Sequence, residues 1–237
     1  MPPVIIAHRT SPLDAPENSL EGIAASVAAG ADFVEVDVRL TRDGVPVLLH
    51  DALLLLTAWV PLPVSWLPAR WVRWLRVRGS GRPVPTFAEA VAAVPPGVGL
   101  AVDTKAPDAA DAVVAELRRQ GRLGDCLLWA QSEQAVRRYV ALAGDEAPEV
   151  ALLRDALTPE AIDRFLADAV AFGARAISVH QDSLDEALIA RAHDLGLRVH
   201  CWFQNRETQR AKARLPLDGI VTDWPAEARA LSHGPAS

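Results

Sequence analysis

The chain has 237 residues, of which half are hydrophobic, and a formal net charge of −6 at pH 7. This length and composition are sufficient for one large α/β domain with a sizeable core. The acidic balance argues against nucleic acid as a partner, because a phosphate backbone requires a basic surface. The two cysteines, Cys126 and Cys201, lie in apolar strand-like runs and are expected to be buried thiols, which suits a reducing compartment.

The beginning of the sequence does not have the pattern of a secretory signal. Met1-Pro2-Pro3 leads directly into the short apolar run 4–7, with no basic region before it. The longest uncharged stretch, 52–69, approaches membrane-spanning length, but Pro61, Pro63 and Pro68 interrupt it. We therefore expect a cytoplasmic protein without a transmembrane helix.

The first third of the chain contains three extended apolar runs with polar ends. The run 4–7 ends at His8-Arg9, and Asn18-Ser19 can then cap an alanine-rich helix that ends at Gly30. Two further runs flank the turn Arg42-Asp43-Gly44, and the second of them ends in His50-Asp51. These runs predict three strands, with no helix between the second and the third.

Strand and helix signals alternate over the rest of the chain. After a capping box at Thr86 and Glu89, strands are predicted over 99–105, 126–131, 149–154, 176–181, 198–205 and 219–223. Helices are predicted over 108–120, 132–142, 159–171, 183–195 and 206–213. This alternation predicts an α/β fold, a (β/α)8 TIM barrel in one domain spanning 1–237. Nine strand-like runs are one more than a barrel needs, so we expect it to be irregular after the second strand.

Charged and imidazole side chains stand at the C-terminal ends of the first four predicted strands. Because side chains alternate along a strand, Glu35 and Asp37 point to the same side, as do Asp103 and Lys105. Barrel active sites gather at the C-terminal ends of the strands. The positions therefore predict one shared site, formed by His8, Glu35, Asp37, His50, Asp103 and Lys105.

The residue types in this predicted site indicate a chemistry. Glu35, Asp37 and Asp103, without cysteine ligands, suit a hard divalent cation such as Mg²⁺ or Ca²⁺. Two histidines suit an acid–base pair, in which one takes a proton from the nucleophile and the other protonates the leaving group. Arg9 and Lys105 offer positive charge to an anionic substrate. Together these groups favour transfer at a phosphate ester.

With these residues assembled, the sequence resembles the glycerophosphodiester phosphodiesterase family, whose barrel is like that of phosphatidylinositol-specific phospholipase C. The resemblance covers most of the chain in order. It rests on Ala7-His8-Arg9, Pro16-Glu17-Asn18-Ser19, the stretch 30–38 with Glu35 and Asp37, the stretch 41–47 with His50-Asp51, Asp103-Thr104-Lys105, the stretch 196–205 with Trp202, and the stretch 218–225 with Asp223.

The resemblance implies a TIM barrel that hydrolyses glycerophosphodiesters to sn-glycerol 3-phosphate and an alcohol with a divalent metal. It implies that His8 and His50 are the acid–base pair, and that the metal ligands are Glu35, Asp37 and Asp103. Arg9 and Lys105 would hold the phosphate, and Trp202 would line the substrate pocket. Glu17, near His8 in the sequence, is expected either to support the metal shell or hydrogen-bond glycerol, or to form a salt bridge within its loop.

The sequence departs from the family pattern at four places. Thr10 stands where the family usually has glycine after His-Arg, and Asp103 stands where it usually has glutamate. The Arg-Thr-Thr motif expected after His50-Asp51 is absent, and Ala130-Gln131 replaces an expected Ser-Phe. None of these changes removes a group that the mechanism requires. They leave open a barrel that binds phosphodiesters with little turnover.

Two further substrate classes remain open. An Asp-x-Lys motif in place of Glu-x-Lys is similar to the related sphingomyelinase D enzymes, which share the barrel and the histidine pair. The Pro-Glu-Asn-Ser segment and the Thr-Arg-Asp-Gly turn favour the glycerophosphodiesterases. Cleavage of lysophospholipid or N-acyl glycerophosphoethanolamine head groups, as by a lysophospholipase D, is therefore an alternative.

The stretch 52–82 is an insertion of unusual composition. It contains Trp59, Trp66, Trp71 and Trp74, four of the seven tryptophans, interleaved with Arg70, Arg73, Arg76 and Arg78. One interpretation is a helical insertion that packs its tryptophans onto the barrel, and another is a dimer contact. A third is a peripheral membrane contact through 59–78, because tryptophan prefers the lipid boundary and arginine meets head groups.

Overall fold

The computed structural model describes residues 2–11, 13–147, 149–155 and 157–233. The strands of this part are β1 (Val4–Ala7), β2 (Phe33–Leu40), β3 (Pro46–Leu48), β4 (Gly99–Thr104), β5 (Cys126–Ala130), β6 (Glu149–Arg154), β7 (Ala176–His180), β8 (Arg198–Phe203) and β9 (Gly219–Thr222). The α-helices are α1 (Leu20–Ala28), α2 (Leu55–Ala58), α3 (Ala69–Val72), α4 (Phe87–Ala93), α5 (Ala110–Arg119), α6 (Glu133–Ala143), α7 (Pro159–Phe172), α8 (Glu186–Asp194), α9 (Arg206–Lys212) and α10 (Pro225–His233).

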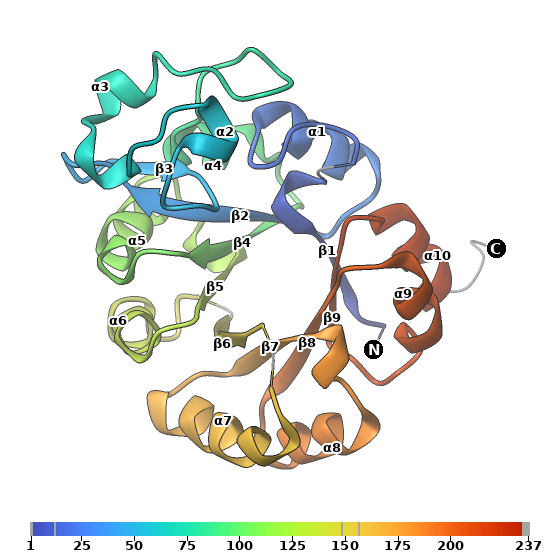
Figure 1. The fold of residues 1–237 in the computed structure, drawn as a ribbon. Helices are drawn as coiled ribbons and strands as arrows, with labels where there is room; N and C mark the ends of the chain where they lie inside the picture. Colours follow the sequence, from blue (N-terminus) through green and yellow to red (C-terminus); the bar gives the residue numbers. More distant parts are fainter. Residues whose placement is uncertain (1, 12, 148, 156, 234–237) are drawn as a thin grey trace.

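Eight of the strands close into a parallel barrel surrounded by helices (Figure 1). Around the barrel the order is β1, β2, β4, β5, β6, β7, β8 and β9, and β9 pairs with β1 again. Helices α5 to α9 lie within about two residues of their predicted ranges, apart from a later start of α8. The (β/α)8 barrel predicted from the sequence is therefore confirmed.

The ninth strand, β3, lies outside the barrel. It pairs with β2 in antiparallel register, Val38 opposite Leu48, so the two strands form a hairpin that rises beyond the barrel rim. The chain returns toward the barrel at Leu49, whose N–H donates to the carbonyl oxygen of Asp37 at 3.0 Å. The expected irregularity after the second strand is confirmed. His50 follows this antiparallel strand and reaches the barrel mouth from outside.

Strand alternation separates an outer core from an inner one. On β2, Val34, Val36 and Val38 point outward to the helices, whereas Glu35 and Asp37 point into the barrel. The outer core is large and aliphatic. The inner core is a smaller cluster that includes Ile6, Ala101, Leu127, Trp129, Ala151, Leu153, Ala176 and Val221. The polar site therefore replaces the upper layer of the inner core.

The insertion 52–82 forms a lobe beside β3, across the barrel from α7 and α8 (Figure 1). Its buried side chains Leu54, Val64, Val72 and Val77 are aliphatic. They form a separate small core with Val47, Leu49 and Val84 from the flanking chain. The four tryptophans do not belong to it and are 60–80% exposed. The interpretation that they pack onto the barrel is therefore wrong. Within the described chain, no helix is both long and apolar enough to cross a bilayer.

Candidate active site

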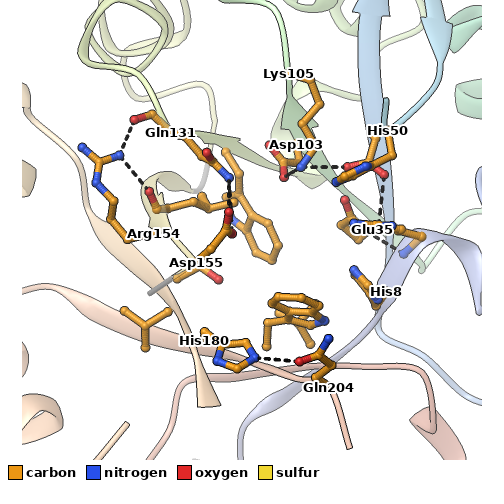
Figure 2. A pocket seen from close by; sticks show the side chains of 18 of the residues that line it. His8, Glu35, His50, Asp103, Lys105, Gln131, Arg154, Asp155, His180 and Gln204 are labelled. Atoms are coloured by element: carbon orange, nitrogen blue, oxygen red, sulfur yellow. Dashed lines mark hydrogen bonds and ion pairs between the residues drawn. The ribbon is translucent and has the colours of Figure 1, made fainter. Parts of the chain in front are cut away.

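A pocket of about 460 Å³ opens at the C-terminal ends of the barrel strands (Figure 2). Of the nine residues predicted for the site, eight line this pocket: His8, Arg9, Glu35, Asp37, His50, Asp103, Lys105 and Trp202. Glu17 is not among the lining residues. Its carboxylate lies 3.3 Å from Nη1 of Arg9, so the structure places it in a salt bridge within the first loop.

Three buried carboxylates from two neighbouring strands form the deepest part of the pocket. Asp37 on β2 stands opposite Asp103 on β4, and Glu35 lies on the same side of β2. One oxygen from each carboxylate lies within 4.8 Å of the others. Burial, together with the charges of Asp37 and Asp103, raises the pKa of Glu35 well above its ordinary value. A cluster of this kind requires a compensating cation to remain fully ionised.

Asp37 is the best supported of the three carboxylates. Asn18 donates from Nδ2 to Oδ2 of Asp37 at 2.8 Å and accepts the Asp37 N–H at 2.9 Å. Burial alone would raise the pKa of Asp37, but Lys105 and Arg9 outweigh it and hold that pKa below the usual range. Asn18 was expected only as a helix cap. Its reach to β2 could not be read from local sequence, because the contact spans 19 residues.

The carboxylate cluster fits a hard divalent cation. All its donor atoms are carboxylate oxygens, the ligands that Mg²⁺ and Ca²⁺ prefer. Oδ1 of Asp103 is buried and has no hydrogen-bond partner among the described residues, so it is free to ligate. The ammonium of Lys105 lies 3.1 Å from Asp37 Oδ1 and 2.5 Å from Asp103 Oδ2. Burial lowers the pKa of Lys105, but the neighbouring carboxylates outweigh this and raise it above its ordinary value.

Arg9 is brought to the carboxylates by an unusual turn. Arg9, Thr10 and Ser11 all have positive φ, between 43° and 61°. This conformation aims the Arg9 N–H at Oε2 of Glu35, at 2.6 Å, while its side-chain Nε lies 3.5 Å from Asp37. The turn thus holds one backbone donor and one guanidinium against the acidic cluster.

Thr10 occupies a left-handed position that glycine adopts more readily. The side chain is completely buried, and its Oγ1 accepts the Ser19 N–H at 3.2 Å. Space for it is provided by Gly22 on α1, where an added Cβ would lie 2.2 Å from that oxygen. The departure from the family glycine is therefore accommodated by packing, and the turn still presents Arg9 to Glu35.

Each of the two predicted catalytic histidines is held by a carboxylate. Nδ1 of His8 lies 2.8 Å from Asp223 Oδ1, and Nδ1 of His50 lies 2.9 Å from Asp51 Oδ1. A carboxylate at Nδ1 favours the tautomer with the proton on that nitrogen, which leaves Nε2 for the reacting groups. Asp223 follows β9 and was not singled out from the sequence. Its signal was its place in the matching stretch 218–225.

Trp202 forms the opposite wall of the pocket from the carboxylates. Its ring centroid lies 5.2 Å from that of His8 and 5.0 Å from that of His180. The indole Nε1 is buried without a hydrogen-bond partner in the described chain. Trp202 thus lines the pocket, and its role toward a substrate stays a prediction.

The half of the pocket contributed by β5 to β8 was not predicted. Figure 2 shows side chains there from Gln131, Arg154, Asp155, His180 and Gln204. His180 Nε2 lies 3.3 Å from Oε1 of Gln204. Gln204 lies in the matching stretch 196–205 and Gln131 at a departure from the family pattern, but the sequence analysis assigned neither a role. The positions of all five at or just after strand ends are a general signal for a barrel site.

The sequence matches the model of the glycerophosphoryl diester phosphodiesterase family over residues 8–227. A relative from Mycobacterium tuberculosis, named "probable glycerophosphodiester phosphodiesterase 2", is 28% identical over 93% of this chain and 87% of its own length. Another Mycobacterium tuberculosis protein, Rv2277c, is 31% identical over 65% of this chain and 56% of its own length.

Solved structures share the fold. A phosphodiesterase from Oleispira antarctica, solved in complex with the product sn-glycerol-3-phosphate, superposes with a TM-score of 0.85 at 23% identity, covering 97% of this chain and 96% of that one. A glycerophosphodiester phosphodiesterase from Agrobacterium tumefaciens superposes with a TM-score of 0.83 at 22% identity, covering 98% of this chain and 100% of that one.

Proposed function

The chain belongs to the glycerophosphoryl diester phosphodiesterase family, and we propose that it hydrolyses glycerophosphodiesters to sn-glycerol 3-phosphate and an alcohol by acid–base catalysis through His8 and His50. The observation that carries this proposal is the pair of pocket histidines, each with Nδ1 on a carboxylate, beside the acidic cluster. The Oleispira relative binds the expected product in the same fold.

In this mechanism one histidine takes a proton at its Nε2 from the attacking water as the new P–O bond forms. The other gives a proton to the oxygen of the departing alcohol as its P–O bond breaks, and we assign this role to His50. Proton exchange with solvent then returns both histidines to their starting protonation states. Asp223 and Asp51 keep both rings oriented and stabilise the imidazolium forms.

The phosphate would be held by the positive groups at the pocket floor. The guanidinium of Arg9 is held by Glu17 and Asp37, and the ammonium of Lys105 by Asp37 and Asp103, so little side-chain ordering is needed when an anion binds. A divalent cation held by the three carboxylates would supply further positive charge for the transferring phosphoryl group. Trp202 would contact the organic part of the substrate through its ring and its free indole N–H.

The test is a hydrolysis assay with glycerophosphocholine beside lysophosphatidylcholine, with and without Mg²⁺ or Ca²⁺. We expect release of sn-glycerol 3-phosphate from glycerophosphocholine, abolished by chelation. His8→Ala and His50→Ala should each lose roughly 10²–10⁴-fold in rate while remaining folded. The double variant should lose less rate than the product of the two single fold losses, because both histidines serve one reaction.

The same assay separates the alternatives. Head-group release from the lysophospholipid alone would assign the chain to lysophospholipase D-like cleavage. Tight binding of glycerophosphocholine without turnover would indicate a binding barrel. Near-normal rates of His50→Ala on glycerophosphocholine would contradict the assignment of His50 as the acid for the leaving group. Full activity after exhaustive chelation would contradict the requirement for a metal.

A further inference from the structure

The insertion 52–82 carries most of the large hydrophobic side chains that are exposed in the described chain. Of the twelve large hydrophobic side chains that are exposed there, eight belong to it: Leu53, Leu55, Leu56, Trp59, Leu62, Trp66, Trp71 and Trp74. Trp74 is 80% exposed. A water-soluble surface rarely concentrates aromatic groups in this way unless a partner or a membrane covers them.

These side chains do not serve the catalytic pocket. No residue of the insertion is among the residues that line the pocket, to which the nearby chain contributes His50. They do not serve the core of the lobe either, because that core is made of valines and leucines such as Val64 and Val72. The exposed tryptophans are therefore available to a contact outside the chain.

The charge of the lobe is opposite to that of the whole molecule. The insertion contains five arginines and has no Asp or Glu, in a chain of net charge −6. Arg73 and Arg82 pair with Glu89 and Glu21 of the barrel helices. Arg70, Arg76 and Arg78 make no ion pair with a carboxylate in the described part of the chain, so their charges are available to an anionic partner.

We propose that this lobe docks the protein onto the surface of an anionic phospholipid bilayer, with the tryptophans at the boundary of the acyl region and the free arginines at the phosphate groups. Tryptophan and arginine are suited to these two positions. Each basic residue near an anionic surface adds about a fivefold gain in partitioning. A second copy of the chain fits less well, because a symmetric contact through this face would bring two sets of arginines together.

The docked lobe would bring the catalytic pocket close to the lipid surface. Arg82 lies 3.3 Å from Glu21 at the N-terminus of α1, and Arg73 lies 2.6 Å from Glu89 at the N-terminus of α4. In this barrel the helices run opposite to the strands, so these helix ends are on the face where the strands end and the pocket opens. Binding through the lobe therefore favours phosphodiesters that are released from, or anchored in, the membrane.

The experiment is sedimentation of the full chain with vesicles of phosphatidylcholine alone or of phosphatidylcholine mixed with an equal amount of phosphatidylglycerol. We expect strong partitioning only to the anionic vesicles, weakened by salt. Trp71→Ala with Trp74→Ala should lower partitioning at least tenfold. Arg70→Gln with Arg76→Gln should lower it roughly 25-fold, from about fivefold for each charge.

The controls lie on the far side of the barrel. Val170→Ala with Leu195→Ala removes two exposed apolar side chains outside the lobe, and Arg164→Gln removes an exposed charge on α7. These variants should bind vesicles like the wild type. All the variants should retain hydrolysis of water-soluble glycerophosphocholine, so that a failure of docking is distinguishable from a failure of the proposed reaction.

Three results would overturn the proposal. The first is absence of binding to anionic vesicles at any lipid concentration. The second is equal binding by the lobe variants and the wild type. The third is a dimer in light scattering that Trp71→Ala with Trp74→Ala dissociates while vesicles recruit neither form, which would assign the lobe to self-association.

Discussion

The orientation of His8 in the catalytic pocket depends on the carboxylate of Asp223. Asp223 contacts Nδ1 of His8, 215 residues away in the sequence, and its replacement by asparagine would allow the ring to turn or to adopt the other tautomer. We expect Asp223→Asn to lower kcat by on the order of 10²–10⁴-fold, as for loss of the histidine itself. Steady-state kinetics with glycerophosphocholine measures this effect.

Thermal unfolding provides the control for that variant. Asp223 and His8 are both partly exposed, so the exchange should change the melting temperature little. Asp51→Asn should behave in the same way through His50, since the two carboxylates hold their rings alike. Full activity of both asparagine variants would show that the histidine orientation does not depend on these contacts.

Gly22 is required by its neighbour, not by the helix in which it lies. A Gly→Ala change inside a helix normally gains about 1 kcal/mol. Here the new Cβ would lie 2.2 Å from Thr10 Oγ1 and 2.3 Å from the Thr10 carbonyl oxygen. We expect Gly22→Ala to destabilise the fold by about 1–3 kcal/mol instead, measured by urea unfolding.

The double variant identifies which atom matters. Thr10→Gly removes the hydroxyl group but keeps the carbonyl oxygen, so it should not rescue Gly22→Ala. Full rescue would mean that the backbone can shift and that only the threonine side chain obstructs. The sequence showed Thr10 as a departure from glycine, but the compensating space at Gly22 became visible only in the packed structure.

The alternation of side chains along a strand was the basis for most of the site prediction. It correctly placed Glu35 and Asp37 on one side of a strand and Asp103 with Lys105 on the next. This alternation predicts the side of the strand on which a side chain lies, but it does not predict the residues that the side chain contacts. The partners that orient the site, Asn18 and Asp223, come from the loop before α1 and from the residue after β9, and the folded barrel brings them to the pocket.

At the scale of the element, the β2–β3 hairpin shows what a strand pattern leaves open. The apolar run before His50 predicted a strand, and a strand forms there. Its direction was not encoded in the pattern, because a short turn and an antiparallel return give the same alternation as a barrel strand. The absence of a helix between the two runs was the available signal, and it predicted the irregular step.

The barrel interior contains a buried contact between His200 on β8 and Glu149 on β6. Nε2 of His200 lies 2.8 Å from Oε1 of Glu149, and both side chains are almost fully buried. Burial alone would raise the pKa of Glu149, but His200 and Arg198 outweigh it and lower that pKa below 4.5. The pair therefore links the two strands most strongly when the carboxylate is ionised.

This pair predicts how stability depends on pH. Because the pKa of Glu149 is lower in the folded state, its contribution is present above about pH 4.5 and is lost as the pH falls through the folded value. Glu149→Gln should cost roughly 1–3 kcal/mol at neutral pH, because it weakens the contact of Glu149 with its buried polar partners. Below pH 4.5 the difference from the wild type should shrink.

Urea unfolding over a pH series measures both effects. Arg164→Gln, an exposed change on α7, is the matched control and should follow the wild-type curve throughout. A constant difference between Glu149→Gln and the wild type at all pH values would contradict the role of ionised Glu149. It would leave the residue as a packing group only.

At the scale of the whole molecule, the alternation of strand and helix signals predicted the barrel but not the surface. Periodic apolar runs specify which side chains face a core, and they were sufficient for helices α5 to α9. The insertion lacks such a period. Val64, Val72 and Val77 are buried and the four tryptophans are exposed, the reverse of the order expected from side-chain size. This outcome depends on how the lobe packs against β3, and a local sequence pattern does not predict that packing.

A cation bound at the carboxylate site should stabilise the whole barrel. Glu35, Asp37 and Asp103 belong to neighbouring strands of a closed sheet, so a cation that they bind is bound only by the folded chain. At a concentration 100 times its Kd, such a ligand stabilises the fold by about 2.7 kcal/mol. For a chain of this size each kcal/mol raises Tm by roughly 2–4 °C.

We therefore expect Mg²⁺ or Ca²⁺ to raise the Tm of the wild type by several degrees, in scanning calorimetry of the chelator-treated protein. Glu35→Gln should abolish this shift. In the absence of metal the same variant should be more stable than the wild type, because it removes one of three mutually repelling buried carboxylates. A merely disruptive substitution would lower Tm under both conditions. A Tm of Glu35→Gln that is above the wild-type value without metal and below it with metal therefore identifies a cation site. An equal loss of Tm in both conditions would contradict such a site.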